Sequence, residues 1–211
     1  MKNRENWAFY DAMPAGVFEE YSRATGLARA PELDLIAPLW QNVDSIIEIG
    51  AGYGRVIEGL LDRNYSGQIY AIERCPKLAT KLREKYASKN VNVIEGDLKR
   101  IELPRANIGL WLWAGIFEFP IDEQSDLIRK VMGSVSTLIL DTNLIGAKSN
   151  ATKQFRGDYE ITLDFGTLKG NVPTEEKIRK FAKDAGYELK RKILYTTETG
   201  RERVLYIISI S

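Results

Sequence analysis

Three acidic residues stand at or just beyond the ends of short apolar runs in the first half of the chain: Glu48, Glu73 and Asp97. Such runs are typical of buried β-strands. The first run leads into a turn in which three glycines alternate with other residues, namely Gly50, Gly52 and Gly54. Glycine adopts turn conformations closed to other residues and lets the backbone approach a ligand closely. Because open α/β sheets bind ligands at the carboxyl ends of their strands, we expect the acids and the turn to share one binding site.

The elements that position these acids alternate between strands and helices. Apolar runs predict strands from Ser45 and over 68–72, 91–94, 108–113 and 136–140, with helices over 55–63, 76–88 and 122–132 between them. This spacing predicts an α/β fold, in which a doubly wound and mostly parallel sheet carries helices on both faces.

The two ends of the chain depart from this alternation. An aromatic segment with a helical turn over 19–23 leads to an amphipathic helix expected over 31–40. After the fifth strand, 146–158 is polar and loop-like, and 159–165 alternates as a half-exposed strand does. A helix after Pro173 ends at Gly186, and strands over 187–195 and 204–210 form an antiparallel hairpin.

The composition excludes several kinds of chemistry. The 211 residues include no histidine and one cysteine, Cys75, so His-dependent triads, His-ligated metals and internal disulfides are excluded and we expect no metal site. A formal net charge of +1 offers no overall attraction to a polyanion, which disfavours a nucleic-acid partner. With no apolar run long enough to span a membrane and no secretory signal, we expect a cytoplasmic protein without membrane association.

The glycine turn distinguishes two kinds of cofactor site. The dinucleotide pattern G-x-G-x-x-G would place its third glycine at Arg55, so a nicotinamide-dependent oxidoreductase is disfavoured. The order acid-x-G-x-G-x-G from Glu48 to Gly54 instead resembles motif I of the class I S-adenosylmethionine-dependent methyltransferases. A sheet that closes with a helix and a terminal hairpin is similar to the seven-stranded layout of that family, from about residue 34 onward.

The resemblance implies a role for each residue around the predicted site. Glu73 would take the ribose hydroxyls of S-adenosylmethionine, and Asp97 the adenine amino group. Leu98 would flank the adenine, and Arg74 would cover the edge of the site. Glu48 and the loop of Gly50, Ala51 and Gly52 would hold the amino-acid end of the cofactor. S-adenosylhomocysteine would be the product.

In the family, the segment after the fourth strand is where the methyl group meets its acceptor. This segment, 111–120, lacks the N/D-P-P-Y/F motif, which disfavours methylation of adenine or glutamine amino groups. Trp113 alternates with Trp111, and we expect its ring to face the pocket because it lies nearer the end of the strand. Glu118 is the candidate base; its alternative role is to cap the helix that starts near Pro120.

We expect a single domain over 1–211. An N-terminal helical arm or lid (1–40), with Tyr10 and Tyr21 as candidate lid residues, precedes the cofactor-binding core (41–145). An insertion near the acceptor site (146–172) comes next, and a closing helix and hairpin (173–211) end the chain. The insertion carries four residues suited to an acceptor pocket: Phe155, Arg156, Tyr159 and Phe165.

The favoured function is transfer of a methyl group, by S_N2 displacement, to an O or N atom of a small-molecule acceptor. Methyl transfer mainly requires alignment and exclusion of water, so a missing histidine is no obstacle. The alternatives are methylation of a protein or RNA, and a non-catalytic module that binds S-adenosylmethionine. Neither the identity of the acceptor nor the oligomeric state follows from these residues.

Overall fold

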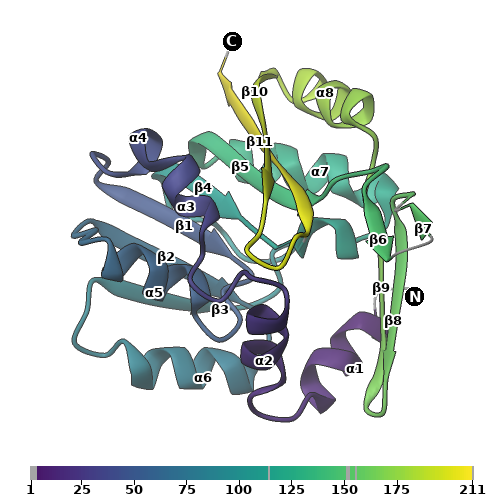
Figure 1. Ribbon diagram of the computed structural model, residues 1–211. Coiled ribbons are helices and arrows are strands. Elements are labelled where there is room, and N and C mark those ends of the chain that lie inside the picture. The colour runs from purple at the N-terminus through teal and green to yellow at the C-terminus, as the bar shows by residue number, and fades with distance from the viewer. Residues whose placement is uncertain (1–3, 114, 151–152, 155, 211) are drawn as a thin grey trace.

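Seven strands form the central sheet of the computed structural model, which describes residues 4–113, 115–150, 153–154 and 156–210. The order across the sheet is β10-β11-β5-β4-β1-β2-β3. Strands β1 to β5 pair in parallel, and β11 is antiparallel to both of its neighbours. The strands are β1 (Ser45–Ile49), β2 (Gln68–Glu73), β3 (Val91–Glu95), β4 (Ala106–Trp111), β5 (Val135–Asn143), β10 (Tyr187–Thr196) and β11 (Glu202–Ile210). The predicted fold class, including the C-terminal antiparallel hairpin, is confirmed (Figure 1).

Helices cover both faces of the sheet and divide the core in two. On one face, α7 (Ile121–Met132) and α8 (Glu175–Asp184) pack with Ile47 and Ile49 of β1. On the other face, α5 (Arg55–Asp62) packs with Ile46, and α6 (Pro76–Lys85) adds Leu82. Alternate side chains of β1 therefore enter opposite cores, as the two-residue period of a strand requires.

The amphipathic helix expected over 31–40 is two short helices instead, α3 (Glu32–Leu35) and α4 (Ala37–Trp40). Ile36 separates them with φ −118°. Pro38 explains the break, because proline has no N–H to donate and its ring clashes with the carbonyl four residues earlier. The predicted apolar face survives, since Leu33 and Trp40 are fully buried in the core.

The N-terminal arm and the insertion hold more regular structure than the sequence indicated. The arm forms α1 (Arg4–Ala12) and α2 (Val17–Ala24), and the expected turn over 19–23 lies inside α2. The segment expected to be loop-like contains β6 (Lys148–Asn150) and β7 (Lys153–Gln154). Strand β8 (Asp158–Leu163) pairs with β9 (Gly166–Asn171), which the sequence did not predict. Helix α1 lies beside this hairpin (Figure 1), and Asn6 exchanges hydrogen bonds with the backbone of Lys169.

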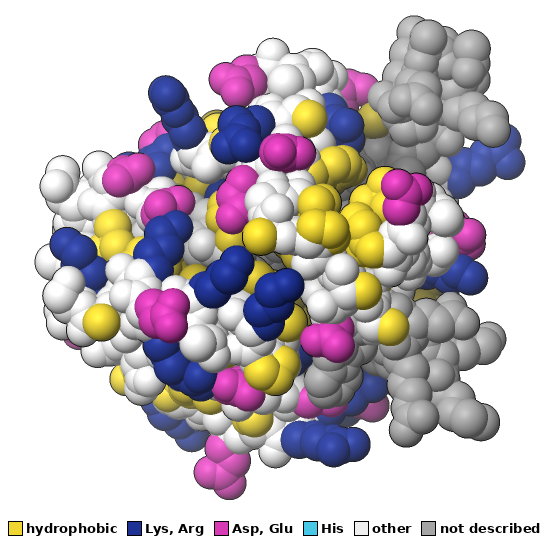
Figure 2. Space-filling view, turned by 90° about the horizontal axis from the view of Figure 1, so that it is seen from below, with side chains coloured by type: hydrophobic (Ala, Val, Ile, Leu, Met, Phe, Trp, Pro, Cys, Tyr) yellow, Lys and Arg dark blue, Asp and Glu magenta, His cyan; other side chains and the backbone are white. Residues whose placement is uncertain are grey.

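Charges of both signs are mixed on the surface. Figure 2 shows basic and acidic side chains interspersed on the face seen from below. The basic run at 177–192 is likewise paired with acids: Arg179 and Lys192 both contact Glu175, and Lys180 contacts Asp184. Within the described ranges, no helix is both long and apolar enough to cross a membrane.

Gly54 is the N-cap of α5, and Tyr86 leaves no room for a side chain there. Its φ is +90°, and an added Cβ would lie 2.5 Å from the Tyr86 hydroxyl. Gly186 has a similar φ of +84° with nothing within 4 Å of an added Cβ.

We expect Gly186→Ala to lower the free energy of unfolding by about 1–2 kcal/mol, the cost of a left-handed alanine. Gly54→Ala should lower it by a further ~1–3 kcal/mol through overpacking. Urea denaturation measures both, and equal losses would show that Tyr86 yields without cost.

Candidate functional site

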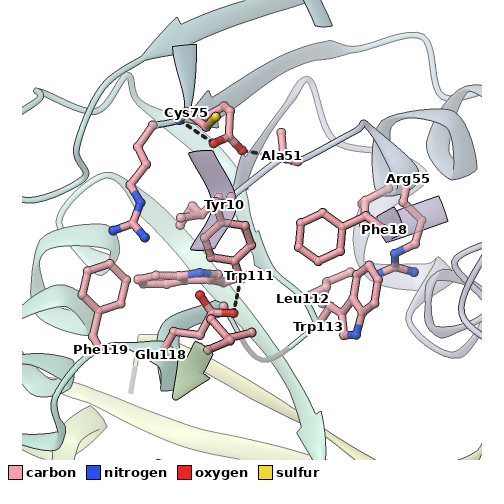
Figure 3. A pocket seen from close by; sticks show the side chains of 18 of the residues that line it. Tyr10, Phe18, Ala51, Arg55, Cys75, Trp111, Leu112, Trp113, Glu118 and Phe119 are labelled. Carbon is pink, nitrogen blue, oxygen red and sulfur yellow. Dashed lines mark hydrogen bonds between the residues drawn. The ribbon is translucent and has the colours of Figure 1, made fainter. Parts of the chain in front are cut away.

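One cavity of about 1380 Å³ opens at the carboxyl ends of the parallel strands. The residues predicted to bind the cofactor or to take part in catalysis all lie on its lining: Glu48, Gly50, Ala51, Gly52, Glu73, Arg74, Asp97, Leu98, Trp113 and Glu118. Figure 3 shows Ala51 and Cys75 at one part of this cavity, and Tyr10, Trp111, Glu118 and Phe119 gathered at another. The structure thus brings the predicted residues together, and the role of each stays a prediction.

The glycine turn is pinned to the end of β2. The N–H groups of Gly50 and Ala51 donate to the Ile72 carbonyl at 2.9 and 3.0 Å. The Gly52 N–H donates to Glu73 Oε2 at 2.8 Å. Gly50 and Gly52 have φ of +72° and +58°, and a Cβ at Gly50 would meet nothing within 4 Å. The turn therefore needs glycine for its conformation and leaves open space above its backbone.

Glu73 is held by backbone on both carboxylate oxygens. Besides the bond from Gly52, its Oε1 accepts from the Cys75 N–H at 2.7 Å. Burial raises the pKa of Glu73 while these backbone hydrogen bonds lower it. A carboxylate oxygen has more than one lone pair, so each oxygen can accept a further hydrogen bond from the cavity.

Glu48 is a buried carboxylate with an unsatisfied oxygen. Its side chain is 4% exposed, and its Oε2 has no hydrogen-bond partner within the described part of the chain. Burial raises the pKa of Glu48 to about 8, against the lowering effect of Arg55. A buried acceptor without a partner costs free energy, so this oxygen suits a cationic donor brought in by a ligand.

Asp97 and Leu98 complete the side of the cavity beyond β3. Asp97 is half-buried, and its Oδ1 accepts from the Lys99 N–H at 2.9 Å, which fixes the carboxylate in a local turn. Leu98 is buried against Ile72 in one core cluster. An apolar surface beside an oriented carboxylate is an arrangement that can hold a flat, amino-bearing ring.

Glu118 lies at the other part of the cavity, on the short 3-10 helix η1 (Gly115–Glu118). The Tyr10 hydroxyl, which comes from α1, donates to its Oε1. The N-cap of α7 is Pro120, so the alternative in which Glu118 caps that helix is not realised. Burial raises the pKa of Glu118 to about 7, while the Tyr10 hydrogen bond lowers it. The carboxyl can therefore take up or release a proton near neutral pH.

Trp113 lies beyond the strand that was expected to contain it. Strand β4 ends at Trp111, and Trp113 has φ +59°, a left-handed conformation that is rare for a bulky side chain. Its ring stacks on Tyr21 with centroids 5.8 Å apart and lies 5.5 Å from the Phe18 ring. Trp111 enters the core and also borders the cavity. Trp113 thus joins the lining through an irregular backbone, which strand alternation does not predict.

The strained backbone of Trp113 is held by a buried cluster that the sequence did not reveal. The Trp113 N–H donates to Asp141 Oδ2 at 3.1 Å, and the Tyr195 hydroxyl donates to Oδ1 at 2.8 Å. Arg203 donates from Nε to both oxygens at 3.2 Å and from Nη1 to Asn143 at 2.7 Å. Asp141 is fully buried and Arg203 is 2% exposed. Asp141 lies within β5 and Arg203 is 62 residues away in β11, so no local sequence pattern joins them.

Arg55, which breaks the dinucleotide pattern, has a structural role of its own. It is buried, with Nη2 2.6 Å from Glu32 and Nη1 donating to the Leu27 carbonyl at 2.9 Å. Its guanidinium lies 5.4 Å from the Trp113 ring centroid. Arg55 therefore connects the start of α5 to the N-terminal arm and lies beside Trp113 at the lining of the cavity.

Residues from the arm and the insertion close the cavity. Tyr10, Phe18 and Tyr21 line it from α1 and α2, and Arg156 and Tyr159 from the insertion. Phe165 packs on Phe9, with ring centroids 4.9 Å apart, instead of lining the cavity. Phe155 lies outside the described residues. The predicted lid role of the arm stays a prediction.

Asp141 offers a stability test of the buried cluster. Asp141→Ala leaves the Arg203 charge buried without its carboxylate, which should lower the free energy of unfolding by about 3–5 kcal/mol. Asp184→Ala removes an exposed pair with Lys180 and should cost at most about 1 kcal/mol. Asp141→Asn, which keeps two polar atoms, should fall between them. Urea denaturation compares the three variants, and equal costs for both alanine variants would contradict the buried-pair argument.

Sequence comparison finds relatives of part of the chain. Residues 46–136 match the family of methyltransferase domains, a segment that includes Glu48, Glu73 and Asp97. A probable ribosomal RNA small subunit methyltransferase A of Thermococcus onnurineus is 41% identical over 64 residues, which are 30% of this chain and 23% of that protein. An ornithine lipid N-methyltransferase of Singulisphaera acidiphila is 31% identical over 100 residues, which are 44% of this chain and 52% of that protein. The matches thus span about a quarter and about half of the length of these relatives.

Structure comparison extends over nearly the whole chain. A solved S-adenosylmethionine-dependent methyltransferase from Clostridium acetobutylicum aligns over 93% of this chain and 97% of its own, with a TM-score of 0.70 and 12% identity. At that identity the likeness shows the fold. The predicted resemblance to the class I S-adenosylmethionine-dependent methyltransferases is therefore confirmed, by the match of residues 46–136 to methyltransferase domains and by the shared fold.

Proposed function

We propose that this protein transfers the methyl group of S-adenosylmethionine to an O or N atom of a small-molecule acceptor. The observation that carries the proposal is one continuous cavity, in which three strand-end acids and an open glycine turn adjoin an aromatic chamber with a carboxyl group. The first part suits the cofactor and the second part suits an acceptor. Both must border one space if a methyl group is to pass between them.

The residues at the strand ends fit the cofactor chemically. The unpaired oxygen of Glu48 is a partner for the ammonium at the amino-acid end, beside the open space above Gly50. Glu73, already oriented by backbone, would accept from the ribose hydroxyls, and Asp97 from the adenine amino group. Arg74 would cover the edge of this site. When bound, the cofactor supplies a methyl group on a positively charged sulfur, which makes the carbon open to attack.

The residues at the acceptor end would align the acceptor and exclude water. Trp113, Phe18 and Tyr21 pack together over the cavity, which favours a desolvated reaction space. Trp113 would hold the acceptor against the methyl carbon, and Glu118 would receive its proton. Methyl transfer depends more on the alignment of acceptor, methyl carbon and sulfur than on a strong base.

A small acceptor is favoured over RNA by the cover that α1, α2 and β8 place on the cavity and by the mixed charges of the surface. RNA is the second candidate, because relatives named ribosomal RNA methyltransferases match part of the chain. Methyl incorporation into RNA but not into small acceptors would favour it. A cofactor-binding protein without turnover would bind S-adenosylmethionine and methylate neither. A cytoplasmic location, expected from the single cysteine, stays a prediction.

Cofactor binding is the first test. We expect S-adenosylmethionine and S-adenosylhomocysteine to bind at about micromolar dissociation constants in calorimetric titrations. Asp97→Ala and Glu73→Gln should each weaken binding about tenfold or more, because each removes a hydrogen bond to a charged group. Asp126→Ala, which changes an exposed acid on α7, should leave affinity unchanged. Binding of a nicotinamide nucleotide in place of both ligands would overturn the proposal.

The raised pKa of Glu48 makes cofactor binding depend on pH. In the free protein this carboxyl has a pKa of about 8 and is mostly protonated at pH 7. A bound ammonium lowers the pKa of Glu48, because an opposite charge favours its ionised form. Binding should then release protons and strengthen as pH rises from 6 to 8. Titrations at pH 7 in buffers of different ionisation enthalpy measure the release, which Glu48→Gln should abolish. Equal proton release by the parent and Glu48→Gln would assign it to another group.

A further inference from the structure

Glu118 lies among aromatic rings at the acceptor end. Tyr10, which donates its hydroxyl hydrogen to the Glu118 carboxylate, stands on one side, and Phe119 follows in the chain (Figure 3). All three border the cavity. A carboxylate that lies near aromatic rings can favour a cation in two ways, through its own negative charge and through the negative faces of the rings.

The structure already holds a cation at this position. The guanidinium carbon of Arg74 lies 6.0 Å from the ring centroid of Tyr10 and 6.0 Å from that of Phe119. Its charge also lowers the pKa of Glu118. Arg74 reaches this point from the loop after β2 on a long, half-buried side chain. A positive group therefore already lies within 6.0 Å of both ring centroids and acts electrostatically on the Glu118 carboxyl.

We propose that the acceptor is an alkyl amine, which enters as its ammonium ion between Tyr10 and Phe119, displaces the Arg74 guanidinium, and gives a proton to Glu118. The inference rests on the proposed function and names its substrate class. The ammonium replaces one positive charge with another, so the charge balance around Glu118 is kept. When no acceptor is bound, the Arg74 guanidinium supplies the positive charge near Glu118.

Other acceptor classes fit these residues less well. An alcohol holds its proton far too tightly for a carboxyl group whose pKa is about 7, whereas an ammonium ion holds it only a few pKa units more tightly. A carboxylate acceptor would meet the like charge of Glu118. A neutral ring would gain nothing from the carboxylate.

The reaction balances with these groups alone. The ammonium loses one proton to the Glu118 carboxylate, which leaves a neutral amine with a free lone pair. That lone pair forms the new N–C bond while the C–S bond of S-adenosylmethionine breaks and its electrons remain on sulfur. The products are a methylated ammonium ion and neutral S-adenosylhomocysteine. The proton on Glu118 then passes to solvent when the product leaves.

Three probes of the same shape and different charge test the inference by binding. They are choline, its neutral isostere 3,3-dimethyl-1-butanol, and the anion 3,3-dimethylbutanoate. Each is titrated calorimetrically into the full chain saturated with S-adenosylhomocysteine. We expect choline to bind at least about tenfold more tightly than the alcohol, and the anion to bind weakest.

Matched variants identify the groups responsible. Glu118→Gln should remove most of the preference for choline over the alcohol. Tyr10→Phe keeps the ring but loses the hydrogen bond that lowers the pKa of Glu118, so the preference for choline should weaken at neutral pH and return at higher pH, where Glu118 is ionised. Arg74→Leu should strengthen choline binding several-fold, because the internal cation no longer competes. Glu176→Gln, an exposed acid on α8, should bind the probes as the parent does.

An activity arm uses 3,3-dimethylbutylamine and 3,3-dimethyl-1-butanol with S-adenosylmethionine. Formation of S-adenosylhomocysteine with the amine and not with the alcohol is expected. Tightest binding of the anion, with Arg74→Leu weakening it, would overturn the amine inference and assign Arg74 to an anionic acceptor. Equal binding of all three probes would also overturn it, while leaving the cofactor proposal intact. Failure of S-adenosylhomocysteine itself to bind would overturn the proposed function, and the inference with it.

Discussion

The buried carboxylate of Asp141 joins three segments that meet at the cavity. It receives the Trp113 N–H from the end of β4, the Tyr195 hydroxyl from β10 and the Arg203 guanidinium from β11. Without this acceptor, a bulky residue would have little reason to stay in a left-handed conformation, and a buried arginine would lack its counter-charge. The geometry around Trp113 therefore depends on the Asp141–Arg203 ion pair. Arg203 lines the cavity, whereas Asp141 lies behind it in the core.

A second buried pair supports the same ring from another direction. Arg55 contacts Glu32 of the N-terminal arm and lies near the Trp113 ring. Buried ion pairs are weak sources of net stability, but they are costly to break and so fix relative position. Together the two pairs hold Trp113 between the sheet and the arm. The arm is thus attached to the cavity end of the sheet by specific polar contacts, not by apolar packing alone.

Local patterns are enough to predict the sheet and to bring three acids to one edge of it. Apolar runs, glycines and strand-end acids act through residues close in sequence, so Glu48, Glu73 and Asp97 were placed at one edge before the structure was known. The Asp141–Arg203 pair depends on the register of β11 against β5, and sequence separation hides that register. Strand β9 escaped prediction because its glycines and lysine weaken the strand pattern. The helix expected over 31–40 is broken by Pro38, whose effect on the preceding turn the apolar periodicity alone does not reveal.

The two halves of the cavity differ in how far their carboxyl groups are already paired within the protein. At the cofactor half, an unpaired oxygen of Glu48 and the oriented oxygens of Glu73 are acceptors without enough donors. At the acceptor half, Glu118 already has a phenol and a nearby guanidinium. A ligand with its own donors and positive charge is needed to complete the first half, whereas a ligand enters the second only by exchanging with Arg74. Under the proposed function, the cofactor half would be preorganised for tight binding and the acceptor half for turnover, since a site that exchanges one cation for another can also release its product.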